Sequence, residues 1–245
     1  MWLPKHESNF KMQLFYTPTL TPEATSFTFD REESKHIIKV LRKKEGDSIH
    51  VTNGLGNLFE TVITIASDSK CTVSIQKVHT ATPNKTHLHL AVAPTKMNER
   101  YEWFLEKATE IGISEITPIL CDNSERTVVK VDRMEKILVS AMKQSNQYFL
   151  PKLNEPIRFQ KFIDQAFSGQ KFIAHCEETN KKSLKEALVK NQNVLVLIGP
   201  EGDFSVKEIE MALSNNFIPV TLGATRLRTE TAAVVACHSV VFNNE

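Results

Sequence analysis

The hydrophobic and polar positions of the chain change their rhythm near residue 80. Up to that point, short runs rich in β-branched residues alternate with polar turns, which is typical of strands. Asn53-Gly54 lies between two such runs and predicts a hairpin. An amphipathic helix is predicted over residues 31–43, with Ile37, Ile38 and Leu41 on its inner face. Short strands around one helix predict a small β-barrel over residues 12–80.

Beyond a linker at residues 81–86, strands and helices alternate to the end of the chain. Strands are predicted at 87–93, 116–120, 172–175, 194–198 and 218–222, and helices at 99–111, 132–144, 183–190, 205–215 and 229–242. In the first helix, Trp103, Leu105, Ala108 and Ile111 are expected to pack inward. Ser205 and Glu208 have the spacing of a capping box. This alternation predicts an α/β fold over residues 87–245, with a parallel sheet covered on both faces.

Composition narrows the function classes. The 245 residues carry 30 basic and 29 acidic side chains, for a net charge of +1, so a nucleic-acid site would be a local patch. The sequence contains no run of 18 apolar residues, so no membrane span is predicted. Residues 1–11, an extension outside the barrel, lack the apolar stretch of a secretory signal, and a cytoplasmic protein is expected.

The usual metal and nucleotide motifs are absent. The four cysteines lie far apart, which argues against a disulfide framework or a zinc site, and we expect no metal. His87 and His89 share one face of a predicted strand, but no third ligand lies near, so solvent-facing side chains are the favoured interpretation. The sequence contains no GxGxxG, GxxxxGK[ST], HExxH or GxSxG motif.

Two glycine-bounded loops carry the candidate chemistry. The first, residues 197–205 (LIGPEGDFS), follows an apolar run, and the second, residues 222–232 (LGATRLRTETA), follows another. Three of only eight glycines, Gly199, Gly202 and Gly223, lie in these loops, which suggests close approach of the backbone by another group. Ligands bind at the carboxyl ends of parallel strands. Either loop alone could be an ordinary turn between a strand and a helix, but together they favour a site containing Glu201, Arg226, Arg228 and Glu230.

These two loops resemble the C-terminal signature of the small-subunit ribosomal RNA uridine-N3 methyltransferases, the RsmE family. Further blocks at residues 12–16 (MQLFY), 36–42 (HIIKVLR), 106–112 (EKATEIG) and 124–126 (SER) extend the resemblance over nearly the whole chain. The resemblance implies a SPOUT-class α/β domain with a trefoil knot, preceded by a PUA-like barrel. It also implies a homodimer that uses S-adenosyl-L-methionine to methylate N3 of a uridine in 16S ribosomal RNA, with the small ribosomal subunit as partner.

The resemblance also assigns roles to residues. The adenosine pocket would be lined by backbone groups of Leu197, Ile198, Gly199, Leu222, Gly223, Leu227 and Arg228. Arg228 would stabilise the developing uridine anion, and Glu201 or Glu230 would act as base or orient that arginine. A structural ion pair between Arg228 and Glu230 is the alternative.

RNA contacts are expected from basic side chains at helical spacing. These are Lys35, Lys39 and Arg42 or Lys43 on the predicted helix of the barrel, together with Arg126 from a family block. Such a face could bind RNA phosphates, whereas a solvated surface helix is the simpler interpretation.

The sequence departs from the family pattern in two places. Asp203 stands where the family usually has a second glycine, and Lys143 and Gln147 occupy positions where the family often has a glutamate and an arginine. Two other functions stay open: a methyltransferase of the same fold acting on transfer RNA or another base, and an RNA-binding assembly factor without turnover.

Overall fold

The computed structural model describes residues 13–177 and 181–245, and they divide into two compact units. One unit comprises the described residues up to Pro83 together with Lys143–Phe149, and the other comprises Asn84–Met142 and Leu150–Glu245. The predicted extension over residues 1–11 lies outside the described residues. None of the helices in the described ranges is both long and apolar enough to cross a membrane.

The first unit is built on a five-stranded sheet in the order β1-β3-β4-β5-β2. Its elements are β1 (Leu14–Tyr16), β2 (Ser26–Thr28), α1 (Arg31–Lys35), the π-helical turn η1 (His36–Val40), β3 (Ser48–Thr52), β4 (Asn57–Ile65) and β5 (Thr72–Thr80). The predicted hairpin is confirmed, because β3 and β4 pair in antiparallel register across residues 53–56. Ile37, Ile38 and Leu41 pack into the core of this unit, as expected.

The helix predicted over residues 31–43 is shorter and less regular than the sequence indicates. The last helical residue is Val40, and η1 is closed by the Leu41 N–H, which donates to the carbonyl of His36. Arg42 then adopts a left-handed backbone with φ of 56°, which ends the helix. Propensity gave no sign of this stop, because Leu41, Arg42 and Lys43 all favour helices.

Residues 143–149 belong to the first unit although they continue the helix α3 (Val131–Gln144), whose residues up to Met142 belong to the second. The Gly56 N–H donates to the carbonyl of Tyr148 at 2.8 Å, and Leu55 forms an antiparallel bridge with Phe149. The Lys143 ammonium lies 5.7 Å from the centre of the Phe15 ring. Lys143, one of the departures from the family pattern, therefore takes part in a cation–π contact with the barrel core.

The second unit is the expected α/β fold. Its elements are β6 (Leu88–Val92), α2 (Asn98–Ile111), β7 (Glu115–Leu120), α3 (Val131–Gln144), β8 (Lys152–Leu153), β9 (Ile157–Arg158), α4 (Phe159–Ile163), β10 (Gln170–Ala174), β11 (Lys182–Ser183), α5 (Leu184–Ala187), β12 (Val194–Ile198), α6 (Val206–Ser214), β13 (Ile218–Thr221) and α7 (Thr229–Asn244). The strand order is β11-β13-β10-β12-β6-β7-β8, with β9 also on β7, and the pairings are parallel.

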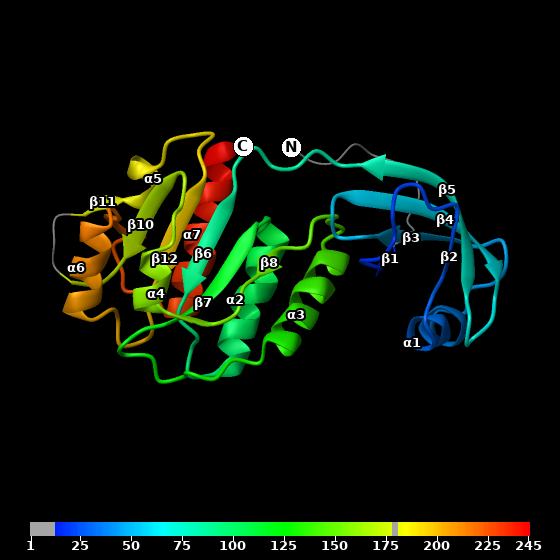
Figure 1. Cartoon of the computed structure of the whole chain (residues 1–245), viewed down its shortest axis with the longest axis horizontal. Coiled ribbons are helices and arrows are strands. Elements are labelled where there is room, and N and C mark those ends of the chain that lie inside the picture. Colours follow the sequence, from blue (N-terminus) through cyan, green and yellow to red (C-terminus); the bar gives the residue numbers. More distant parts are fainter. Residues whose placement is uncertain (1–12, 178–180) are drawn as a thin grey trace. The chain divides into compact units, whose positions relative to one another are not determined.

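Helices cover both faces of this sheet (Figure 1). On one face, Val194, Val196 and Ile198 of β12 pack with α2, α3 and α7. On the other, Leu195 and Leu197 pack with α4 and α6. The alternation explains why β12 is apolar at every position: it is buried on both sides.

Two expectations about side chains in this unit are wrong. Trp103 is 43% exposed, whereas Leu105 and Ala108 are buried as predicted, and Tyr101 and Phe104 are buried beside them. His89 is buried rather than solvent-facing, and its Nε2 lies 2.7 Å from the Thr117 hydroxyl. The reason is that Phe162 and Phe167 cover this face of β6, with the Phe162 ring edge-on to the imidazole.

Candidate active site

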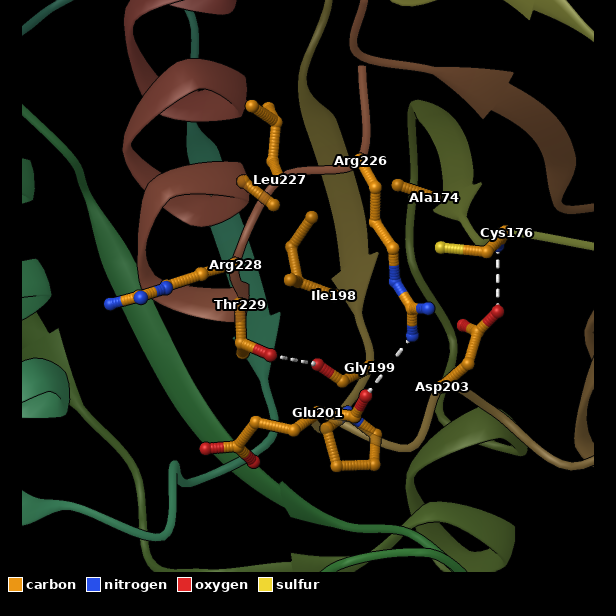
Figure 2. A pocket seen from close by; sticks show the side chains of 12 residues that line it. Ala174, Cys176, Ile198, Gly199, Glu201, Asp203, Arg226, Leu227, Arg228 and Thr229 are labelled. Carbon is orange, nitrogen blue, oxygen red and sulfur yellow. Dashed lines mark hydrogen bonds between the residues drawn. The ribbon is translucent and has the colours of Figure 1, made fainter.

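A cavity of about 340 Å³ lies at the carboxyl ends of β10 and β12, where parallel strands offer ligands their backbone groups. Its walls come from three segments, as Figure 2 shows. The lining residues are Ala174, Cys176, Ile198, Gly199, Pro200, Glu201, Asp203, Arg226, Leu227, Arg228, Thr229 and Ala232. The two glycine-bounded loops of the sequence thus meet around one cavity.

Strand alternation decides which residues of β12 reach the cavity. Ile198 faces the side of α7 and lines the cavity, whereas Leu197 faces the opposite side and packs with α4 and α6. Gly199 follows, and a Cβ there would lie 3.0 Å from the Phe204 ring. Gly199 therefore has a packing reason to be glycine, and its approach to a ligand stays a prediction.

Two hydrogen bonds join the loops. The Thr229 hydroxyl donates to the carbonyl of Gly199 at 3.1 Å, and this contact is buried. The Arg226 guanidinium donates to the carbonyl of Glu201 at 3.4 Å (Figure 2). The start of α7 is thereby fixed to the end of β12, which holds the cavity walls together.

Asp203 closes the far side of the cavity. Its backbone is left-handed with φ of 64°, a conformation that suits the glycine usual at this position and that aspartate tolerates. One carboxylate oxygen accepts the Cys176 N–H at 2.6 Å, and the other accepts the Phe204 N–H at 2.9 Å. The departure from the family pattern thus keeps the backbone conformation and adds a tie to the end of β10.

The side chains of Arg228 and Glu201 leave the cavity on the side away from Cys176 (Figure 2). Arg228 is exposed and precedes α7, and its guanidinium has no hydrogen-bond or ion-pair partner among the described residues. The Glu201 carboxylate accepts the Lys96 N–H at 2.9 Å. Arg228 is therefore a cation at this site that no other described residue engages, which leaves it available to a substrate.

Glu230 lies apart from the cavity walls. It is buried in the first turn of α7, its Oε1 is 3.8 Å from Nε of Arg100, and its Oε2 has no hydrogen-bond partner among the described residues. The alternative of an ion pair between Arg228 and Glu230 is wrong, because Glu230 pairs with α2 instead. Successive residues at a helix start point in different directions, so spacing alone could not decide this.

The cavity contains part of the predicted cofactor set. Ile198, Gly199, Leu227 and Arg228 line it, whereas Leu197, Leu222 and Gly223 are not among its walls in the described chain. Sequence reasoning missed Ala174 and Cys176, because periodicity does not reveal that β10 pairs beside β12. Thr229 and Asp203 lay within the two loops, so their position in the loops was the available signal.

The predicted RNA-binding residues do not form one helical face. Lys35, Lys39 and Arg42 are exposed, but Arg42 lies beyond the helix, and Lys43 is half-buried with its ammonium donating to the carbonyl of Ser48. The helical spacing behind the prediction therefore ends at Val40, and RNA binding by these residues stays a prediction. Lys39 forms an exposed ion pair with Asp68. Arg126, in the other unit, binds backbone carbonyls of its own chain.

Comparison with known proteins identifies the family. Residues 82–241 match the RNA methyltransferase domain family, and residues 29–76 match the RNA methyltransferase PUA domain family. The ribosomal RNA small subunit methyltransferase E of Buchnera aphidicola is 31% identical over 87% of both chains. The chain belongs to the ribosomal RNA small subunit methyltransferase E family.

Solved structures agree with this methyltransferase E assignment. A crystal structure described as a probable rRNA-methyltransferase from Porphyromonas gingivalis has a TM-score of 0.85 and 40% identity, covering 92% of this chain and 95% of that one. A methyltransferase from Legionella pneumophila, solved with bound S-adenosylmethionine, has a TM-score of 0.84 and 28% identity, covering 95% and 97%. The expected α/β fold and PUA-like first unit of a methyltransferase E are confirmed, whereas the trefoil knot stays a prediction.

Proposed function

We propose that this chain transfers a methyl group from S-adenosyl-L-methionine to N3 of a uridine in 16S ribosomal RNA, at position 1498 in the usual numbering. The observation that carries the proposal is the cavity where the two glycine-bounded loops meet, in a chain of the methyltransferase E family. The Legionella relative with bound S-adenosylmethionine supports the choice of cofactor.

The residues of the cavity fit this cofactor. A volume of about 340 Å³ is within the range of small-molecule sites. Ile198, Leu227 and Ala232 offer apolar surface to an adenine ring, and the carboxylate of Asp203 offers negative charge near the positively charged groups of the cofactor. When bound, the cofactor supplies a methyl group on positively charged sulfur.

The chain itself must prepare the uridine. N3 carries a proton, and if its pKa lies about two units above neutral, forming the anion at pH 7 costs roughly 3 kcal/mol. Arg228, exposed and without a partner in the described chain, is our candidate for stabilising that negative charge. Glu230 remains a candidate for orienting the site through α7, and its contact is with Arg100.

Partners follow from the same proposal. We infer that the substrate is presented within the small ribosomal subunit in the cytoplasm, and that the enzyme acts as a homodimer with a knotted catalytic domain. Lys35, Lys39 and Arg42 of the PUA-like unit are the proposed phosphate contacts, because an exposed cation favours a polyanion. No resident metal is proposed.

The test is methyl transfer from labelled S-adenosylmethionine to small ribosomal subunits that lack the modification, with naked 16S RNA and transfer RNA in parallel. Mass spectrometry then identifies the methylated nucleoside. We expect 3-methyluridine in the subunit.

Label in transfer RNA alone, or a different nucleoside, would assign another substrate. Cofactor binding without label on any RNA would mean that the proposed substrate is wrong. No cofactor binding at all would overturn the enzyme proposal.

A further inference from the structure

The loop between β6 and α2 is held by side chains from two other loops. Glu201, which follows β12, accepts the Lys96 N–H at 2.9 Å. Arg126, which follows β7, donates from Nε to the carbonyl of Thr95 at 3.1 Å and from Nη2 to the carbonyl of Lys96 at 2.6 Å. Three polar backbone groups of two adjacent residues are thereby satisfied by one acid and one arginine.

The loop is fixed from inside as well. Thr95 is fully buried, and its hydroxyl donates to the carbonyl of Met97 at 2.7 Å. Because the guanidinium has a rigid, planar set of donors, Arg126 can bind two successive carbonyls at once, which a lysine could not reproduce. Removing Arg126 would leave both carbonyls without these charge-assisted bonds.

The residues that hold this loop line two different cavities. Glu201 lines the cavity assigned to the cofactor. Arg126, together with Lys96, Glu125, Thr127 and Val128, lines a second cavity of about 360 Å³. The Lys96 ammonium there lies 2.8 Å from Glu125, but both side chains are more than half exposed. Such a pair contributes little stability and can exchange its carboxylate for a phosphate.

We propose that Glu201 and Arg126 are positioning residues that fix the backbone of Thr95 and Lys96, with the Lys96 side chain thereby presented to a phosphate of the target strand at the second cavity. This inference rests on the proposed function. It offers another role for two residues of the sequence analysis, which expected Glu201 or Glu230 to act as base or to orient Arg228, and Arg126 to contact RNA directly. Neither side chain needs to touch the reacting atoms, because each acts through the loop.

The two roles of Glu201 are separated by Glu201→Gln and Glu201→Ala. The amide oxygen of glutamine still accepts the Lys96 N–H, so Glu201→Gln should keep kcat within about threefold and leave the pH profile of kcat unchanged. Glu201→Ala frees the loop and should lower kcat/KM for RNA by about tenfold or more. Loss of turnover in Glu201→Gln equal to that in Glu201→Ala would assign Glu201 as the base and overturn the proposal.

For Arg126, the test compares two quantities in each variant, the KM for RNA and the Kd for the cofactor. Arg126→Ala should raise the RNA KM by about tenfold and change the Kd of S-adenosylmethionine by less than about threefold, with Arg126→Lys in between. Lys96→Ala should raise the RNA KM and reduce its salt dependence. Arg133→Ala is the matched control, because this arginine pairs with the Glu102 side chain and not with the loop.

An unchanged RNA KM in Arg126→Ala, or an equal loss of cofactor binding, would overturn the positioning role. The unsubstituted enzyme distinguishes this failure from failure of the proposed function. If it forms no 3-methyluridine, the proposed function is at fault, whereas normal product with unaffected variants rejects only the inference about the loop.

Discussion

At the scale of single residues, Arg228 carries the clearest prediction. Its guanidinium is exposed, lies at the mouth of the cavity and has no partner in the described chain. Arg228→Ala should lower kcat by about 100-fold, which is typical of removing one group that stabilises developing charge. The measurement is single-turnover methyl transfer at saturating RNA, with Arg133→Ala as control.

The pH dependence of Arg228→Ala gives an independent check. The uridine anion becomes about tenfold more abundant with each pH unit until the pH reaches the pKa of the uridine. Because Arg228 is proposed to stabilise this anion, the parent enzyme should reach its plateau at a lower pH than Arg228→Ala. The deficit of the variant relative to the parent should therefore shrink towards pH 9. Turnover equal to that of the parent enzyme at pH 7 would remove Arg228 from the chemistry.

Three substitutions of Asp203 are expected to lower the stability of the protein to different extents. Asp203→Asn keeps a side-chain acceptor and a residue that tolerates the left-handed backbone, so its stability should be near that of the parent. Asp203→Gly keeps the backbone but loses the bonds to Cys176 and Phe204. Asp203→Ala loses the bonds and adds backbone strain of about 1 kcal/mol. Urea unfolding should rank Asn above Gly and Gly above Ala, and an alanine variant as stable as the glycine variant would refute the strain.

At the scale of elements, β6 and β7 carry a pH-dependent contact. Burial lowers the pKa of His89 from its usual 6.5 to about 4. Between these two pH values the imidazole is therefore mostly neutral in the folded protein and mostly protonated in the unfolded chain. Burial alone would raise the pKa of Glu115, but hydrogen bonds from Asn154 and Lys152 lower it to about 2. His87 and Lys152 also face this cluster.

Both pKa shifts lower the free energy of unfolding as the pH falls, but each acts over a different pH range. The unfolded chain binds the His89 proton from about pH 6.5 down to 4, and the Glu115 proton from about pH 4.5 down to 2. His89→Gln should therefore flatten the fall in unfolding free energy between pH 6.5 and 4, by up to about 3 kcal/mol. Urea unfolding across this range tests it, with exposed His238→Gln as control. Equal slopes in both variants would contradict the assignment to His89.

The elements differ in how far the sequence predicts them. The five long strands of the second unit were found because each is an apolar run between turns, and the capping box at Ser205 and Glu208 is present as expected. The two-residue strands β8, β9 and β11 are too short to show any period. η1 also escaped, because its residues have the same apolar spacing as an α-helix. Tertiary pairing, not local pattern, creates these elements.

At the scale of the whole molecule, chain order misleads about one segment. Lys143–Phe149 contains the end of α3 and the residues after it, but it belongs with the described residues up to Pro83. Nothing in its composition marks it, and its ties to the rest of the first unit include hydrogen bonds to the carbonyl of Tyr148, a bridge and a cation–π contact. The part of the site at β12 and the start of α7 could be predicted from the sequence, because ligands bind at the carboxyl ends of parallel strands. The part at β10 could not, because it depends on β10 pairing with β12 in the sheet.

The division of labour between the two units gives the last prediction. If the PUA-like unit binds RNA phosphates, reversing two exposed charges, Lys39→Glu with Arg42→Glu, should weaken RNA binding by at least tenfold at low salt. It should also reduce the steepness of log affinity against log salt by about one to two, because RNA binding releases fewer counterions when fewer phosphates are contacted.

A double variant with the same change in net charge, Lys77→Glu with Lys85→Glu, separates local contact from overall charge, since both lysines are exposed outside α1 and η1. We expect its slope to stay near that of the parent, and cofactor affinity to be unchanged in both variants, because the cavity lies wholly within the second unit. Equal losses in the two double variants would mean that net charge, not the surface around Lys39 and Arg42, governs RNA binding.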